Sequence, residues 1–131
     1  MSNDNNPFNI VGDNTVPMQG GQPLTDIDKS KDLKEQIESI IGKTDIVLFM
    51  KGTPDMPMCG FSANSIAILN SLGTTYTTFN ILEDMDIREG LKEYANWPTY
   101  PQLYFKAQLV GGNDIITEMY NSGDLTELIK S

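Results

Sequence analysis

Apolar residues along this chain follow helical and strand spacings in turn. Between residues 30 and 41, four apolar positions share one helical face, and Gly42 provides a C-terminal stop. These four positions are Leu33, Ile37, Ile40 and Ile41. Residues 46–50 are an unbroken apolar run, rich in β-branched and aromatic side chains, which predicts a buried strand. The segment Thr-Tyr-Thr-Thr-Phe-Asn at residues 75–80 predicts a second strand.

A helix between these two strands is predicted over residues 63–72. Ile66, Leu69 and Leu72 recur there at intervals of three, and Gly73 follows as a stop. An order of strand, helix and strand implies a right-handed parallel crossover.

The next helix is predicted to begin at Asp86. This residue resembles an N-cap because Glu89 follows three positions later, and the helix must end before Pro98. The residues expected on its apolar side are Ile87, Leu91 and Tyr94.

The C-terminal third predicts a hairpin followed by two helices. Residues 102–105 and 108–110 are short strands separated by Lys106 and Ala107, which is consistent with an antiparallel hairpin. The closing helices are expected at residues 114–121 and 124–130. The alternation of helices and strands predicts an α/β fold.

Composition divides the chain into a tail and one domain. Residues 1–23 are rich in Asn, Gly and Pro and contain few large apolar residues, so we expect a disordered tail. Residues 24–131 are long enough to bury a core and are expected to form a single domain.

The charge and the cysteine content indicate which binding partners and which cellular compartment to expect. The chain has 18 acidic and 9 basic residues, no His and a net charge of -9, which disfavours binding to nucleic acid or to anionic membranes. No apolar stretch is long enough to span a bilayer. No Lys or Arg precedes Lys29, so we expect neither a secretory signal nor an Arg-rich transit peptide. A single cysteine cannot form an internal disulfide, so we expect a cytoplasmic protein.

That cysteine, Cys59, lies between the predicted strand 46–50 and the predicted helix 63–72. Unpaired N–H groups and the helix dipole at a helix N-terminus stabilise a thiolate, which is the form that attacks disulfides or binds metal. A lone cysteine is more often a small buried apolar residue. The neighbouring Pro54, Pro57 and Gly60 favour a reactive or metal-binding thiol, because a packed interior rarely needs such a rigid loop.

Several separated motifs carry a specific resemblance to one family. They are Lys51, Cys59-Gly60-Phe61-Ser62, Trp97-Pro98-Thr99-Tyr100-Pro101-Gln102-Leu103, and Gly111-Gly112 with Asp114. Together they resemble a monothiol glutaredoxin of the CGFS type, over about residues 33–130. The resemblance implies a thioredoxin-like fold, with a four-stranded mixed sheet flanked by helices.

The resemblance also implies two cations for the glycine carboxylate of glutathione. Lys51 matches the lysine that contacts both this carboxylate and the active thiol, and Arg88 matches a basic residue that helps to hold the carboxylate. From local sequence alone, a solvated lysine at a strand end would be the commoner case for Lys51. Arg88 could instead form an ion pair with Asp86 or Glu89.

The wall of the glutathione groove is implied to contain Thr99, Tyr100 and Pro101. Pro101 matches the position of a cis proline beside the active cysteine, and the backbone of Tyr100 would pair with an extended glutathione. Phe61, inside the cysteine motif, belongs to the same implied set. Rigid loop packing around Thr99 is the alternative.

The γ-glutamyl end of glutathione is implied to bind at residues 112–114. Residues 111–114 are expected to begin a helix, so the N–H groups of Gly112 and Asn113 can donate to a carboxylate, while Asp114 can accept a hydrogen bond from the ammonium. A plain turn and an ordinary helix cap at Asp114 are the alternatives. Many relatives carry a cysteine where Asn113 stands, so this chain lacks that partner for a disulfide with Cys59.

Two functions are consistent with one thiol. Ser62 replaces the second cysteine of a dithiol site, so intramolecular dithiol exchange is excluded. In the first hypothesis, Cys59 from each of two chains and two glutathione molecules hold a [2Fe–2S] cluster in a homodimer. The resemblance implies that such a cluster passes to iron–sulfur acceptor proteins, often with a BolA-type partner.

The second hypothesis is a glutathione-dependent oxidoreductase that removes glutathione from proteins through Cys59. The inserted loop at residues 53–57 resembles a feature associated with poor turnover in this family. Cluster carriage is therefore the preferred function. An inert thioredoxin-like domain is disfavoured because the thiol is retained among so many matching residues.

Overall fold

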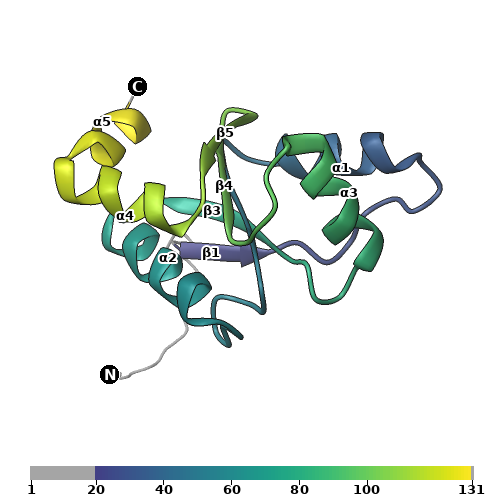
Figure 1. Ribbon diagram of the computed structural model, residues 1–131, viewed down its shortest axis with the longest axis horizontal. Coiled ribbons are helices and arrows are strands. Elements are labelled where there is room, and N and C mark those ends of the chain that lie inside the picture. The colour runs from purple at the N-terminus through teal and green to yellow at the C-terminus, as the bar shows by residue number, and fades with distance from the viewer. Residues whose placement is uncertain (1–19, 131) are drawn as a thin grey trace, which may run out of the picture.

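A five-stranded mixed sheet separates two layers of helices (Figure 1). This computed structural model describes residues 20–130. The strand order is β1-β3-β2-β4-β5, with β1, β3 and β2 parallel and β4 and β5 antiparallel to their neighbours. The strands are β1 (Gly20–Pro23), β2 (Ile46–Met50), β3 (Thr75–Asn80), β4 (Gln102–Phe105) and β5 (Gln108–Gly111).

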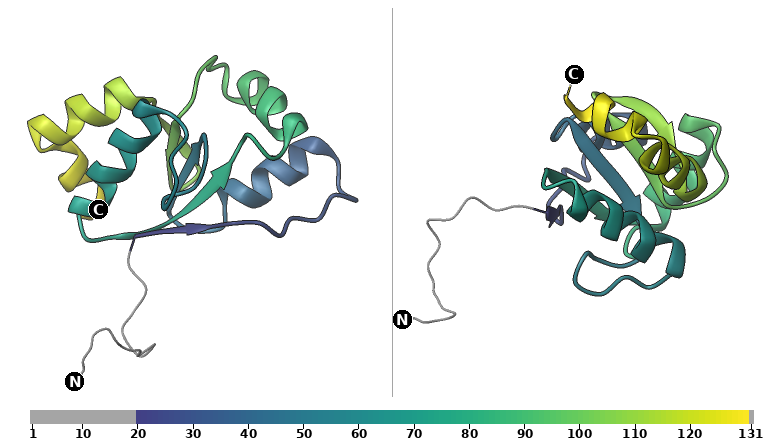
Figure 2. Two further views of the ribbon diagram at one scale, coloured as in Figure 1. Left: turned by 90° about the horizontal axis from the view of Figure 1, so that it is seen from below. Right: turned by 90° about the vertical axis from the view of Figure 1, so that its left-hand side faces the viewer.

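Five helices cover the sheet. They are α1 (Leu33–Ile41), α2 (Gly60–Ser71), α3 (Met85–Ala95), α4 (Asn113–Ser122) and α5 (Asp124–Lys130). Helices α1 and α3 lie on one side, and α2, α4 and α5 lie on the other (Figures 1 and 2). Within residues 20–130, no helix is long and apolar enough to cross a bilayer.

The central strand β2 supplies side chains to both layers. Val47 and Phe49 belong to the apolar core beneath α1 and α3, whereas Ile46, Leu48 and Met50 belong to the core beneath α2, α4 and α5. This alternation follows from the period of two residues in a strand. All five residues are buried, so the predicted buried strand is confirmed.

The fifth strand was not predicted. Residues 20–23 were expected in the disordered tail, but Gly20–Pro23 pair in parallel with Thr75–Thr78 of β3, so the expectation was wrong for these four residues. A Gly-Gly-Gln-Pro segment has little intrinsic strand preference, and its extended form comes from pairing with the sheet edge. The rest of the expected tail, residues 1–19, lies outside the described residues.

Helix α3 differs from the prediction in two details. Its N-cap is Asp84, whose carboxylate accepts a hydrogen bond from the Ile87 amide at 3.1 Å, and Asp86 lies in the first turn instead. Tyr94 was expected on the apolar face but is 43% exposed, and its hydroxyl donates to Glu38 at 3.4 Å. An amphipathic phenol at the margin of a helical stripe can direct its polar end to solvent.

The predicted hairpin is present, and its turn residues have left-handed backbone conformations. The φ angles of Lys106 and Ala107 are 48° and 67°, as a two-residue type I′ turn between twisted strands requires. Such angles are costly for residues with a β-carbon.

Replacing Ala107 by glycine is therefore expected to raise the free energy of unfolding by about 0.5–1 kcal/mol. The same change at Ala67, an exposed residue inside α2, should lower the free energy by a similar amount, because glycine weakens a helix interior. Chemical denaturation of both variants measures the two effects. An Ala107→Gly variant less stable than the parent protein would contradict this account of the turn.

Candidate functional site

Cys59 lies at the junction of the loop after β2 and the start of α2. It is the N-cap residue of α2, with φ -158° and ψ 140°, and its carbonyl accepts from the Ala63 amide at 2.9 Å. The side chain is partly exposed. The predicted position of the thiol at a helix N-terminus is thus the observed one.

The environment of Cys59 stabilises its thiolate. A hydrogen bond from the backbone N–H of Ser62 has the largest influence and lowers the pKa of the thiol. Partial burial raises the pKa, but the N–H of Phe61, the hydroxyl of Ser62 and the charge of Lys51 lower it, and the net pKa lies below its ordinary value. More of the reactive form is therefore present near neutral pH.

Ser62 has a structural part that the sequence did not reveal. It is fully buried, and its hydroxyl oxygen accepts a hydrogen bond from the Lys51 amide at 3.1 Å while its proton serves the thiol of Cys59. Ser62 thereby links the end of β2 to the thiol. Sequence reasoning treated it only as the missing second cysteine, although a hydroxyl one helical turn after a thiol is a usable signal.

The loop at residues 53–57 returns the chain from Lys51 to Cys59. Thr53 and Met56 exchange backbone hydrogen bonds of 3.2 and 3.0 Å, and the Met58 amide donates to the Lys51 carbonyl at 2.9 Å. Gly52, with φ of 94°, has no room for a β-carbon beside the Met56 carbonyl. This closed turn brings Lys51, which follows β2, close to the thiol of Cys59.

A groove of about 270 Å³ opens beside the start of α2. It is lined by Phe61, Trp97, Thr99, Tyr100, Gly112, Asn113, Asp114 and Ile115. The structure thus brings together six of the predicted glutathione-binding residues with Trp97 of the quoted motif, and adds Ile115. The other four predicted residues do not line the groove; they are Lys51, Cys59, Arg88 and Pro101.

One wall of the groove follows a cis peptide bond between Tyr100 and Pro101, as the resemblance implied. The fully buried Gln102 fixes this wall, because its side-chain N–H groups donate to the carbonyls of Trp97 at 3.1 Å and Thr99 at 3.2 Å. The hydroxyl of Tyr104 donates to the Gln102 side chain at 3.0 Å. A polar residue inside the otherwise apolar segment 102–105 was the available signal for this role.

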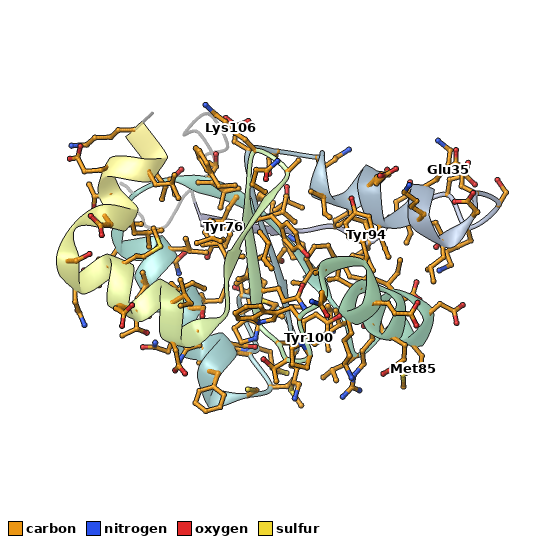
Figure 3. All side chains as sticks on the ribbon, turned by 45° about the horizontal axis from the view of Figure 1, so that its top comes forward. Glu35, Tyr76, Met85, Tyr94, Tyr100 and Lys106 are labelled. Atoms are coloured by element: carbon orange, nitrogen blue, oxygen red, sulfur yellow. The ribbon has the colours of Figure 1, made fainter. Side chains whose placement is uncertain are left out.

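Arg88 is tied to the same wall through Tyr100. The Tyr100 hydroxyl donates to the Arg88 carbonyl at 2.7 Å, and Figure 3 shows this tyrosine beside α3. Glu89, a candidate partner of Arg88, contacts Lys92 instead at 3.4 Å. Among the described residues, the buried Nε of Arg88 and Nε1 of Trp97 have no hydrogen-bond partner. Unpaired buried donors are costly, so their presence in this region favours an acceptor from outside the chain.

The opposite wall is the start of α4. The helix begins at Asn113 with Gly112 as its N-cap, so the interpretation of Asp114 as an ordinary cap is wrong. A β-carbon on Gly112 would lie 3.3 Å from both the Pro101 carbonyl and Nε1 of Trp97, so glycine allows the two walls to approach.

The side chain of Asn113 joins this wall to α2. Its oxygen accepts hydrogen bonds from Asn64 at 2.8 Å and from Ser65 at 3.1 Å. Asn113 therefore connects the start of α4 to the helix that follows Cys59.

The chain is similar to known proteins of the glutaredoxin family. The glutaredoxin family model matches residues 46–110. Probable monothiol glutaredoxin 2 of Rickettsia typhi is 49% identical over 102 residues, which cover 78% of this chain and 91% of that protein. The chain belongs to the monothiol glutaredoxin family.

Two further comparisons define the extent of the match. The solution structure of reduced poplar apo GrxS14 is 47% identical, has a TM-score of 0.67, and matches over 75% of this glutaredoxin and 90% of the poplar chain. The thioredoxin-like fold is confirmed, with one strand more than predicted. This glutaredoxin spans only 35% of glutaredoxin 3 from Danio rerio, to which it is 42% identical over 113 residues.

Replacing Ser62 by alanine should raise the pKa of Cys59 toward the ordinary thiol value of about 8.5, because a donor to the thiolate is lost. Thiolate absorbance as a function of pH measures this shift, and the rate of alkylation by iodoacetamide provides a second reading. Ser122→Ala, which removes a hydroxyl in the last turn of α4, is the matched control. An unchanged pKa in the Ser62 variant would show that the hydroxyl does not act on the thiol.

Proposed function

We propose that this monothiol glutaredoxin binds glutathione in the groove beside Cys59 and, as a pair of chains, carries a [2Fe–2S] cluster to acceptor proteins. The carrying observation is a single thiol with a lowered pKa next to a groove whose lining includes Trp97, the Nε1 of which is buried without a hydrogen-bond partner. The cluster is the cargo of this function. A BolA-type protein is the expected additional partner, and a cytoplasmic location stays a prediction from the sequence.

Glutathione would lie across the groove in an extended form. Lys51 and Arg88 would contact its glycine carboxylate, and the backbone of Tyr100 would pair with its peptide groups. The N–H groups at the start of α4 would receive the γ-glutamyl carboxylate, because a helix N-terminus favours a negative charge. Asp114, which is exposed in the first turn of α4, would accept from the ammonium.

The number of thiolate ligands that a [2Fe–2S] cluster needs links glutathione binding to cluster binding. A [2Fe–2S] centre usually has four thiolate ligands, and this chain has one cysteine. Two chains and two glutathione molecules together supply four. Met56, Met58 and Phe61, near the thiol in sequence, are 68%, 60% and 62% exposed, and flexible apolar side chains of this kind suit a subunit interface.

The lowered pKa of Cys59 also favours a second candidate function, the removal of glutathione from proteins. The Cys59 thiolate would attack the glutathione sulfur of a mixed disulfide, and the protein thiolate would leave. A second glutathione thiolate would then attack the new mixed disulfide, which restores Cys59 and releases oxidised glutathione. This route needs one cysteine and no cluster.

Anaerobic reconstitution with iron, sulfide and excess glutathione separates the two functions. We expect a coloured dimer from the parent protein and a colourless monomer from Cys59→Ser, because each chain contributes its only thiolate. Visible absorption and mass in solution are the measurements, and far-ultraviolet circular dichroism should be the same for both proteins. A cluster retained by Cys59→Ser would refute the ligand assignment, whereas a colourless parent protein that reduces glutathionylated substrates would establish the second function.

Lys51→Ala should weaken glutathione binding about 10- to 150-fold, since a charge-assisted hydrogen bond contributes roughly 1.5–3 kcal/mol. Isothermal titration calorimetry measures the affinity. Lys43→Ala is the control, because Lys43 is an exposed lysine that follows α1. Equal affinities of the Lys51 variant and the parent protein would remove Lys51 from the glutathione site.

A further inference from the structure

Residues 20–29, here called the N-terminal strap, run along the edge of the sheet and then toward α1 (Figure 2). Strand β1 forms the first part of the strap and pairs with β3. Beyond it, the Leu24 amide donates to the Thr78 carbonyl at 2.8 Å, and Leu24 and Ile27 pack against the core beneath α1 and α3. The strap is therefore bound to the domain by both backbone hydrogen bonds and apolar contacts.

The strap contacts the loop that separates Lys51 from Cys59. A β-carbon on Gly21 would lie 2.6 Å from Cγ of Pro54, 3.0 Å from Tyr76 and 3.1 Å from Thr78. The Pro54 ring thus rests directly on the bare backbone of Gly21. Only glycine permits this contact without a shift of the loop, because real β-carbons do not approach other heavy atoms so closely.

The other end of the strap reaches the start of α3. Nζ of Lys29 lies 2.6 Å from the carboxylate of Asp84, the N-cap residue of α3. Partial burial would raise the pKa of Asp84, but the bond and charge of Lys29 and the Ile87 amide lower it below its ordinary value. Lys29 thereby favours the charged form of the cap.

Each of these two contacts lies next to a cation of the proposed glutathione site. Pro54 belongs to the closed turn that begins after Lys51 and ends before Cys59. Asp84 accepts at its carbonyl from the Arg88 amide at 3.0 Å, so it fixes the turn of α3 that bears this arginine. One continuous segment of ten residues therefore contacts the supports of both cations.

We propose that Gly21 and Lys29 are positioning residues of the glutathione site, Gly21 acting through Pro54 on the loop of Lys51 and Cys59, and Lys29 acting through Asp84 on Arg88. The proposal rests on the proposed glutathione function. Neither residue would touch glutathione. Their contacts would set the distances between Lys51, Cys59 and Arg88, which would contact the same glutathione molecule. Small displacements of such ligand-binding groups reduce affinity strongly.

Gly21→Ala tests the first contact. We expect glutathione affinity to fall on the order of three- to tenfold, as for a site displaced by a fraction of an ångström, and the pKa of Cys59 to rise as Lys51 moves away. Gln22→Ala, on the opposite face of the same strand, should change neither quantity. In the double variant Gly21→Ala with Pro54→Ala, the losses should be smaller than the sum of the single effects, because the clashing ring is gone.

Should Gly21→Ala fail to fold, Pro54→Ala removes the same contact from the side of the loop and is expected to raise the pKa of Cys59. Wild-type affinity and wild-type pKa in folded Gly21→Ala and Pro54→Ala variants would overturn this half of the proposal.

Lys29→Ala tests the second contact and should change the glutathione affinity without changing the pKa of Cys59. Glutathione affinity is expected to fall about threefold or more, while the pKa of Cys59 stays unchanged because α3 does not support the thiol. Lys29→Arg should restore the affinity, and Lys43→Ala should leave it unchanged. An affinity equal to that of the parent protein in Lys29→Ala would overturn this half.

The outcomes also separate this proposal from the proposed function. If the parent protein binds no glutathione in calorimetry, the proposed function fails, while the pKa of Cys59 in Gly21→Ala still tests the strap. If the parent protein binds glutathione and the strap variants bind equally well, only the strap proposal fails.

Discussion

Stabilisation of one thiolate at the start of α2 is the interaction on which the rest of the site depends. The central strand β2 ends nine residues before Cys59, the N-cap of α2, and a closed turn between them brings Lys51 close to Cys59. Ser62 completes the link, because its hydroxyl accepts from the Lys51 amide and donates toward the thiol. A residue that cannot act as a second thiol thus helps the first one to ionise.

The periodicity of apolar residues was sufficient to predict the central fold. Strands β2 and β3 and helices α1 and α2 have strong sequence patterns, and their burial follows from them. Strand β1 could not be predicted because Gly-Gly-Gln-Pro extends only through its pairing with β3. The cap of α3 was misplaced because Asp84 and Asp86 are both suitable N-cap residues, and the choice between them depends on tertiary contacts such as that of Lys29.

The residues of the candidate site were harder to predict from the sequence than the fold was. The motifs indicated residues such as Thr99 and Asn113, and the structure gathers them around one groove. The supports of these residues carry no such motif signal: Gln102 holds the Thr99 wall from a buried strand, and Gly21 contacts the active-site loop from the edge of the sheet. Their effect depends on distances between segments far apart in the chain. With one thiol per chain, glutathione is the central element of the proposed function, because it would complete the cluster ligands in the first candidate function and would be the transferred group in the second.

The most direct test of this account is a glutathione titration followed by backbone amide chemical shifts in NMR spectra. The account predicts that the amides of Tyr100, Asn113 and Asp114 shift together and saturate with one dissociation constant, because they border a single groove. Residues on the far side of α1 and α5 should not respond. Shifts that are absent from the groove, or that follow different dissociation constants at its two walls, would contradict a single glutathione site.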